Sequence, residues 1–100
     1  MSVEVTDMNE IALGRIVYSK AGRDKNLFFV VVDYKKPYVS LVDGKLRRLD
    51  SPKKKKDKHI QVTKYIDENI KQLLESENRL TNADIRKSLS QYFEAVNQQQ

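Results

Sequence analysis

The sequence predicts a small antiparallel β-barrel of about residues 12 to 63, followed by a pair of helices over residues 64 to 97. Three observations predict this fold. Apolar runs separated by short turns fill the first half of the chain, apolar residues recur at helical spacing in the second half, and most of the basic residues lie in the first half. Short strands joined by short turns are typical of the antiparallel meander that builds small barrels. One hundred residues suit a single domain of this kind.

Residues 1 to 11 predict an acidic leader ahead of the barrel. This segment carries Glu4, Asp7 and Glu10, has no basic residue, and shows only weak periodicity of its apolar residues. We expect a partly ordered segment whose apolar side chains can dock on the domain.

Residues 13 to 19 and residues 27 to 34 predict the first two strands. The second strand is the more informative, because six apolar residues from Leu27 to Val32 follow one another without alternation. A strand of this kind is covered on both faces. We therefore expect one face to fill the barrel and the other face to lie beneath the helices.

A basic turn, residues 19 to 26, connects these two strands. Gly22 is free to adopt the left-handed conformation of a tight turn, and Asn26 tolerates that conformation better than most residues. Three cationic side chains therefore lie on a short loop held between strands: Lys20, Arg23 and Lys25. Positive charge in such a setting favours a polyanionic ligand over a small neutral one.

Three more short strands complete the predicted barrel. Residues 38 to 42 have the composition of a third strand. The dipeptide Asp43-Gly44 is typical of a two-residue hairpin turn, so we expect a fourth strand over residues 45 to 49. A last strand is expected over residues 60 to 63.

The longest basic stretch follows the predicted fourth strand. Eight basic residues against two acidic residues lie between positions 45 and 58: Lys45, Arg47, Arg48, Lys53, Lys54, Lys55, Lys56 and Lys58. Consecutive lysines repel one another and are expected to be solvated, and a bound polyanion would relieve that repulsion while releasing condensed counterions. A solvated loop and a nuclear-import signal have the same composition, so both alternatives stay open.

From residue 64 the apolar residues recur at the spacing of a helix that runs to about Ser76. Four of them share one face: Ile66, Ile70, Leu73 and Leu74. We expect this apolar face of the helix to pack against another apolar surface of the protein.

Thr81 predicts the N-cap of a second helix, with Asp84 in the capping-box position and Leu80 and Ile85 as a hydrophobic staple. Five apolar residues share one face of this helix: Ile85, Leu89, Tyr92, Phe93 and Val96. We expect the two helices to pack as a hairpin on the outer face of the second strand. A docking surface for a protein partner, including Tyr92, is the alternative.

Composition excludes several classes of function. The chain contains no cysteine, which rules out disulfides and thiolate metal sites. It has no apolar run long enough to span a membrane and no signal-peptide pattern, so we expect a cytoplasmic protein without a membrane partner.

The charged residues are distributed unevenly along the chain. Residues 1 to 60 hold 14 Lys and Arg against 8 Asp and Glu, whereas residues 61 to 100 hold 5 Lys and Arg against 6 Asp and Glu. The basic half is therefore expected to do the binding.

The inventory of reactive side chains predicts no enzyme, no metal site and no cofactor. His59 is the only histidine, and the sequence contains no catalytic triad, phosphate-loop or dinucleotide-binding motif. A lone histidine beside a strand is usually a packing or hydrogen-bonding residue. It can also stack on a base or lie near a phosphate, so we keep His59 as a candidate contact.

The segment from Gly14 to Val31 resembles a KOW motif, the RNA-contacting signature of several ribosomal proteins and transcription factors. A glycine precedes alternating apolar residues, a second glycine follows eight positions later at Gly22, and Arg23, Asp24 and Lys25 come next. Asn26 and Phe29 stand where the family has glycines.

The resemblance extends to about Thr63. An aspartate and glycine precede a basic segment, a lysine run and a histidine, in the order found in bacterial relatives of the KOW-type large-subunit ribosomal protein of archaea and eukaryotes. The residues that match are Asp43, Gly44, Lys45, Arg47, Arg48, Pro52, Lys53 to His59, and Ile60 to Thr63. Membership of that family implies an SH3-like barrel and RNA binding on or near the ribosome.

We therefore expect a β+α protein in which a C-terminal helical hairpin packs on a small SH3-like antiparallel barrel. Its expected partner is structured RNA, above all ribosomal RNA, with ribosomal proteins as further neighbours of a chain that is monomeric when free. The expected RNA contacts are Lys20, Arg23, Lys25, Lys45, Arg47, Arg48, Lys53, Lys54, Lys55, Lys56, Lys58 and His59, with Gly14, Gly22, Asn26 and Gly44 shaping the loops. The alternatives are an SH3-like protein-interaction adaptor of the translation or transcription machinery and a DNA-associated basic protein.

Overall fold

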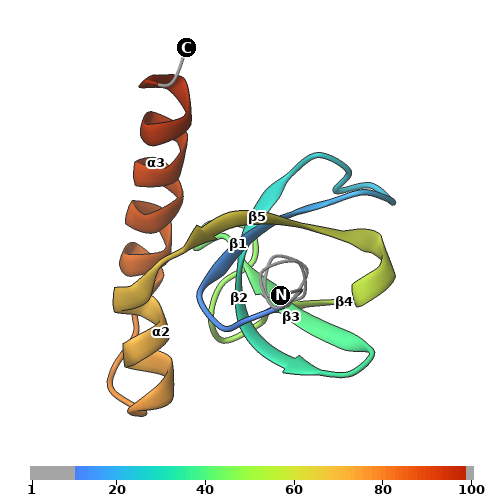
Figure 1. Ribbon diagram of the computed structural model, residues 1–100. Helices are drawn as coiled ribbons and strands as arrows, with labels where there is room; N and C mark the ends of the chain where they lie inside the picture. Colours follow the sequence, from blue (N-terminus) through green and yellow to red (C-terminus); the bar gives the residue numbers. More distant parts are fainter. Residues whose placement is uncertain (1–10, 99–100) are drawn as a thin grey trace, which may run out of the picture.

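The computed structural model describes residues 11 to 98, and the predicted acidic leader lies outside this range apart from Ile11. Within this range the chain forms five strands, one short 3-10 helix and two α-helices (Figure 1). In chain order the elements are β1 (Arg15–Ser19), β2 (Phe28–Lys35), β3 (Tyr38–Val42), β4 (Lys53–Lys56), η1 (Asp57–His59), β5 (Ile60–Ile66), α2 (Glu68–Glu75) and α3 (Asn82–Gln98). A β+α fold with an antiparallel sheet and two helices is therefore confirmed.

All neighbouring strands of the sheet are antiparallel, in the order β4-β3-β2-β1-β5. Both helices lie on one side of this sheet (Figure 1). Because β4 and β5 form its two edges, hydrogen bonds do not close the sheet into a barrel. The SH3-like barrel stays a prediction.

Strand β2 separates two apolar clusters, as its unbroken apolar run predicts. Val30 packs with Ile70, Ile85 and Leu89 of the helices, whereas Val31 lies in a second cluster on the opposite face of the sheet. The side chains that make up this second cluster are Val17, Phe29, Val31, Val39, Leu41 and Ile60, with Ile11, Leu13, Tyr34 and Val62 at its margin. The expectation that the helices cover the outer face of β2 is confirmed.

The helices begin where side chains cap them. Strand β5 continues to Ile66, and the carboxylate of Asp67 accepts a hydrogen bond from the amide of Ile70, so α2 starts four residues later than the periodicity predicts. The capping box of α3 is confirmed, because Thr81 and Asp84 exchange hydrogen bonds between side chain and backbone in both directions.

The prediction of a fourth strand over residues 45 to 49 is wrong, and so is the two-residue turn at Asp43-Gly44. The Asp43 carboxylate accepts hydrogen bonds from the amides of Lys45 and Arg47, while the amides of Asp43 and Gly44 both donate to the carbonyl of Arg47. These bonds fold residues 43 to 47 into a compact turn within a longer β3–β4 loop. The lysine run itself forms the edge strand β4 instead.

Helix α3 docks on this β3–β4 loop at two points. The Asn82 side chain accepts a hydrogen bond from the amide of Leu49 at 2.8 Å, and the Arg86 guanidinium donates to the carbonyl of Gly44 at 2.7 Å. The helix therefore holds the loop that carries Lys45, Arg47 and Arg48. Beyond Leu89 the apolar face of α3 is less covered, and Phe93 and Val96 are exposed.

Candidate nucleic-acid interface

The β1–β2 loop presents its cations from a hydrogen-bonded frame. The Ser19 amide donates to the carbonyl of Leu27, and the Asn26 amide donates back to the carbonyl of Ser19. Gly22 and Asn26 both have positive φ values, at 86° and 71°, as their residue types predict. All three predicted contacts on this loop are exposed: Lys20, Arg23 and Lys25.

Asp24, at the centre of this loop, is buried and connects the loop to β4. Its carboxylate accepts hydrogen bonds from the Ser19 hydroxyl at 2.7 Å and from the Lys55 ammonium at 3.0 Å. The ammonium nitrogen of Lys53 lies 3.4 Å from the other carboxylate oxygen. Burial raises the pKa of Asp24, but the hydrogen bonds from Ser19 and Lys55 and the charges of Lys55 and Lys53 outweigh burial and leave the pKa below its ordinary value.

This lowered pKa predicts how stability changes in acid. A carboxyl group with a lowered pKa in the folded state contributes stability above its unfolded-state pKa of about 3.9, and the contribution is lost as the pH falls through the folded-state pKa. We expect the difference in free energy of unfolding between the wild type and Asp24→Asn to be constant from pH 7 to about 5 and to shrink at lower pH. Urea denaturation at intervals between pH 7 and 2 measures it, and a pH-independent difference would contradict the assigned ion pairs.

The four lysines of β4 alternate between two environments because successive strand residues point to opposite faces. Lys53 and Lys55 lie opposite Leu41 and Val39 of β3 and reach Asp24, so that the Lys55 side chain is only 11% exposed. Lys54 and Lys56 are exposed. The prediction that the whole run is solvated is therefore wrong, because Asp24 compensates the charge of two members and lets the backbone complete the edge of the sheet.

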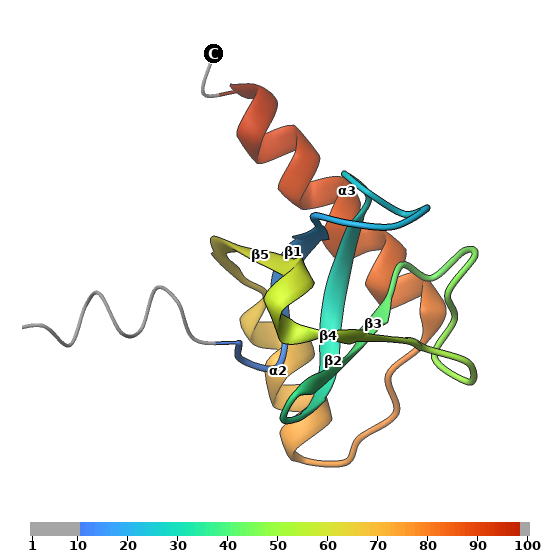
Figure 2. The same cartoon turned by 90° about the vertical axis from the view of Figure 1, so that its right-hand side faces the viewer.

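Cations from three separate segments border one cleft of about 370 Å³. Arg23 comes from the β1–β2 loop, Arg47 from the β3–β4 loop and Lys53 from β4. Figure 2 shows the two loops on the same side of the molecule, with β4 running along its front. The remaining lining residues are Asp24, Leu27, Phe29, Asp43 and Leu46. The structure thus brings together basic residues that lie up to 30 positions apart in the sequence.

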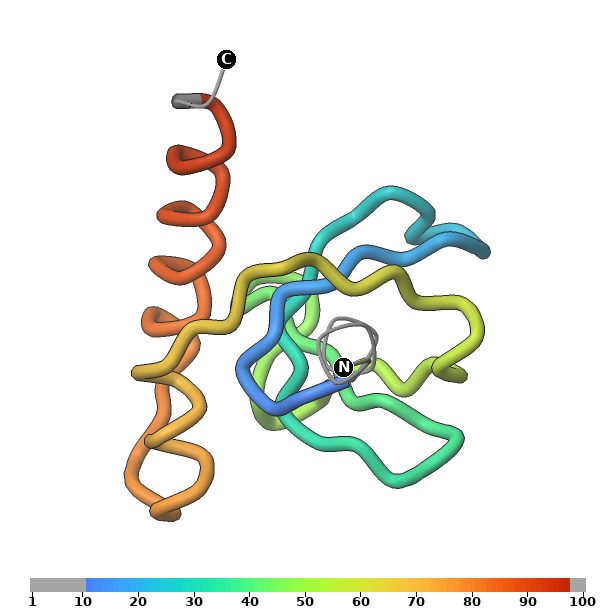
Figure 3. Tube along the Cα trace, viewed as in Figure 1, coloured from blue at the N-terminus to red at the C-terminus, as the bar shows by residue number. Residues whose placement is uncertain are grey.

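A second group of predicted contacts lies at the β4–β5 corner. The Lys20 amide donates to the carbonyl of His59 at 2.8 Å, which places the base of the β1–β2 loop beside η1 and Lys58. Lys58 is exposed and His59 is half-buried. Figure 3 shows this corner and the β1–β2 loop extending away from the helices. The corner is anchored by Asp57, which accepts a 2.7 Å hydrogen bond from the Tyr34 hydroxyl and thereby raises the pKa of Tyr34.

We define the basic face as the surface formed by the β1–β2 loop, the β3–β4 loop, β4 and η1. Lys45 and Arg48 are exposed on the β3–β4 loop and complete the set of predicted contacts. Sequence reasoning did not predict that Asp24 pairs with Lys53 and Lys55, although a single acid inside a basic turn was the available signal. It also missed Leu46, which is 83% exposed between the basic residues of its loop.

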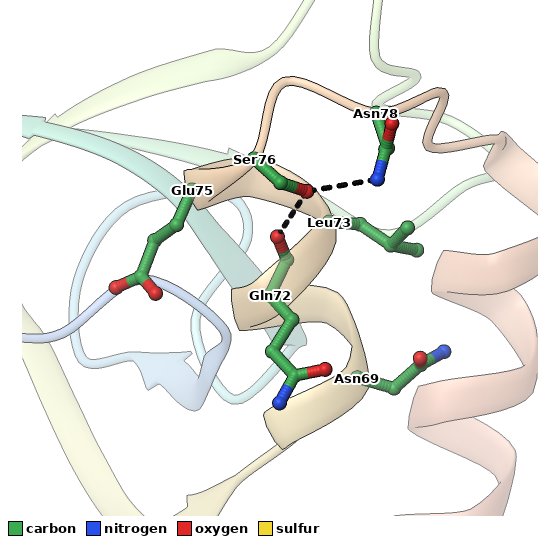
Figure 4. Close-up of a pocket in the computed structure, with 6 residues that line it drawn as sticks. All are labelled: Asn69, Gln72, Leu73, Glu75, Ser76 and Asn78. Carbon is green, nitrogen blue, oxygen red and sulfur yellow. Dashed lines mark hydrogen bonds between the residues drawn. The ribbon is translucent and has the colours of Figure 1, made fainter.

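A different depression, of about 440 Å³, lies at the C-terminal end of α2 (Figure 4). The Ser76 hydroxyl donates to the carbonyl of Gln72, and the side-chain amide of Asn78 donates to the Ser76 hydroxyl oxygen. These bonds satisfy groups at the helix end. Among the described residues, Glu75 is the only charged one that lines the depression, so the depression lacks the convergent charge of the cleft on the basic face.

Within residues 11 to 98, no group of three or more histidine, aspartate or glutamate side chains is placed to hold a metal ion. In the same part of the chain, no helix combines the length and apolar character needed to cross a membrane.

Comparison with models of known protein families gives no match, and comparison with curated proteins gives no similar sequence. The resemblance to KOW proteins therefore stays a prediction.

Proposed function

We propose that this chain is a non-catalytic protein that binds structured RNA through the basic face. The observation that carries the proposal is the pair of contacts from Asp24 to Lys53 and Lys55, which hold the basic turn against the lysine strand. As a result, Arg23, Arg47 and Lys53 border one cleft, while further exposed lysines lie on the opposite side of β4 and at the β4–β5 corner. A polyanion that meets this surface can engage several cations at once.

An SH3-like arrangement of the sheet is part of the proposal. β4 and β5 are its two edges, yet only the three residues of η1 connect them along the chain. A short connection between opposite edges requires the sheet to curl until the edges approach each other. This curvature supports the barrel that the resemblance to KOW proteins implies, and it presents the loops on one side.

Phosphate contacts are expected to dominate binding, with the shape of the RNA setting the preference. Lysines and arginines on loops and at a sheet edge can contact successive phosphates along an RNA strand. Contact with base edges in paired RNA would need a helix or strand that enters a groove of the duplex. Ribosomal RNA is the RNA we propose, on the strength of the resemblance. Co-sedimentation of the chain with large ribosomal subunits from a cell lysate would support that choice, and sedimentation only as free protein would contradict it.

The proposal predicts a steep dependence of RNA affinity on salt. With four or five side chains each meeting a phosphate, the association constant should fall by about three to four decades for each decade of salt. Filter binding of a labelled RNA hairpin between 50 mM and 500 mM salt measures this slope. An affinity that does not change over this range would overturn the proposal.

Two charge-matched variants show where the phosphates bind. Lys54→Gln with Lys56→Gln removes two exposed cations from the basic face, whereas Lys64→Gln with Lys87→Gln removes two exposed cations from β5 and α3. Lys53 and Lys55 are left intact because they neutralise Asp24. We expect the first variant to bind on the order of thirtyfold more weakly at 0.1 M salt, with a slope lower by about 1.5, and the second to change little. Equal losses would mean that binding is not localised on the basic face.

A further inference from the structure

An apolar groove of about 490 Å³ lies between α3 and the loops of the basic face. Its apolar lining comes from Leu27 just before β2, Phe28 of β2, Leu46 of the β3–β4 loop, and Leu89 and Phe93 of α3. Leu46 and Phe93 are 83% and 43% exposed, so much of this apolar surface is in contact with water. A contiguous apolar surface of this kind marks a binding site more often than scattered apolar residues do.

The exposed aromatic ring of Phe93 is held in place by its neighbours. Phe93 packs edge-to-face on Phe28, with the ring centroids 5.3 Å apart and an angle of 87° between the planes, and Tyr92 lies beside both rings. A half-exposed ring that its neighbours hold in place can stack on a planar ligand at little cost in side-chain entropy. The groove is also within the size range of pockets that hold small organic ligands.

The groove is continuous with the cleft of the basic face, because Leu27, Asp43 and Leu46 line both. A phosphate chain bound at Arg23 and Arg47 therefore passes directly beside an apolar, aromatic surface. The polar groups that line the groove are Asp43, Lys45, Arg86, Ser90, Glu94 and Asn97, which offer both donors and acceptors. A site that combines a planar apolar wall, hydrogen-bonding groups and adjacent cations has the chemistry of a nucleotide.

We propose that this groove receives one unpaired base of the bound RNA, at a bulge or loop, stacked against Phe93 and covered by Leu46. The inference rests on the proposed RNA binding and names the feature of the RNA that is recognised. Proteins bind unpaired RNA bases by stacking them on aromatic rings, which a base inside a duplex does not permit. Phosphate contacts on the basic face hold the backbone, and the groove selects RNA with an extruded nucleotide.

Two RNA hairpins with identical stems test this, one fully paired and one with a single additional purine bulged from the stem. The wild type is expected to bind the bulged hairpin about five- to tenfold more tightly, since stacking one base on an aromatic side chain has an effect of this order. Phe93→Ala should lose this preference while keeping its affinity for the paired hairpin. Tyr38→Ala is the matched control, because Tyr38 is 47% exposed on β3 and does not line the groove. This control should keep the preference.

Leu46→Ser provides a second variant that leaves the packing of α3 intact, because the Leu46 side chain is 83% exposed. It should reduce the preference for the bulged hairpin. Equal binding of both hairpins by the wild type would overturn the base site and leave the RNA-binding proposal standing, whereas failure to bind either hairpin would overturn both. Loss of ribosome co-sedimentation by Phe93→Ala, with its RNA affinities unchanged, would assign the groove to a protein partner and would also overturn the base site.

Discussion

Asparagine in place of Asp24 is expected to weaken the fold and to strengthen RNA binding at the same time. The substitution removes the charge that compensates Lys53 and Lys55, and the Lys55 side chain is only 11% exposed. Breaking a fully buried pair costs about 3–5 kcal/mol, and exposure of Lys53 reduces this, so we expect a loss of about 2–3 kcal/mol in the free energy of unfolding. Urea denaturation at pH 7 measures this loss.

The same change leaves two lysines without their carboxylate partner beside the cleft of the basic face. One additional phosphate contact raises the association constant about fivefold at 0.1 M salt and steepens the salt dependence by about 0.7–0.9. Filter binding below the unfolding temperature of the variant measures both quantities. Asp33→Asn is the matched control: it removes the same charge from an exposed position on β2, where we expect less than about 0.5 kcal/mol of destabilisation.

Asp24→Asn is therefore expected to lower the free energy of unfolding and to raise the RNA affinity, and this combination separates the prediction from a purely structural role of Asp24. A purely structural Asp24 would lower stability and leave the RNA affinity of the folded protein unchanged. A weaker RNA affinity in the folded variant would show that the orientation of the lysines matters more than their number, and would contradict the expected gain.

Alanine in place of Gly44 is expected to destabilise the protein by about 3 kcal/mol or more. Gly44 has a φ of 80°, which alone costs a non-glycine residue about 1–3 kcal/mol. An added Cβ would also lie 2.6 Å from the carbonyl oxygen of Asn82 and 2.8 Å from Cγ of Arg86. Neither contact relaxes easily, because hydrogen bonds from Leu49 to Asn82 and from Arg86 to Gly44 dock α3 on this loop.

Gly22→Ala is the matched comparison for this prediction. Gly22 has a similar φ of 86°, but the nearest atom to its added Cβ is the flexible end of Lys55 at 3.3 Å. We therefore expect a loss of about 1–2 kcal/mol, from backbone strain alone. Urea denaturation of both variants with unchanged m-values measures the difference. Equal losses at the two positions would show that close packing of α3 on the β3–β4 loop does not restrict Gly44.

The elements whose signals lie within a few residues of one another were predictable from the sequence. Strands β1, β2 and β3 appear within two residues of their expected bounds, Gly22 and Asn26 have the positive φ values that their residue types favour, and Thr81 caps α3 with Asp84 as its partner. The absence of alternation in β2 correctly indicated a strand covered on both faces. In each case, short-range backbone preference or burial of apolar surface decides the conformation.

The region from residue 43 to 56 was mispredicted, because a competing local hydrogen-bond pattern and tertiary contacts together decide its conformation. Asp43-Gly44 has the local signal of a hairpin, but the Asp43 carboxylate binds two amides of its own loop, and α3 packs against Gly44. Four consecutive lysines have low strand propensity, and they form β4 because β3 offers an unpaired edge and Asp24 accepts two of their charges. A carboxylate 29 and 31 positions away from these lysines is invisible to local pattern analysis.

The sequence by itself therefore determined which cations are available to the basic face, because charge is a property of residue type. The tertiary structure decided which cations are paired, which border the cleft and which apolar side chains lie beside them. Those outcomes depend on distances between β4 and the β1–β2 loop and between α3 and the β3–β4 loop, and such distances exist only once the sheet has curled and the helices have packed on it.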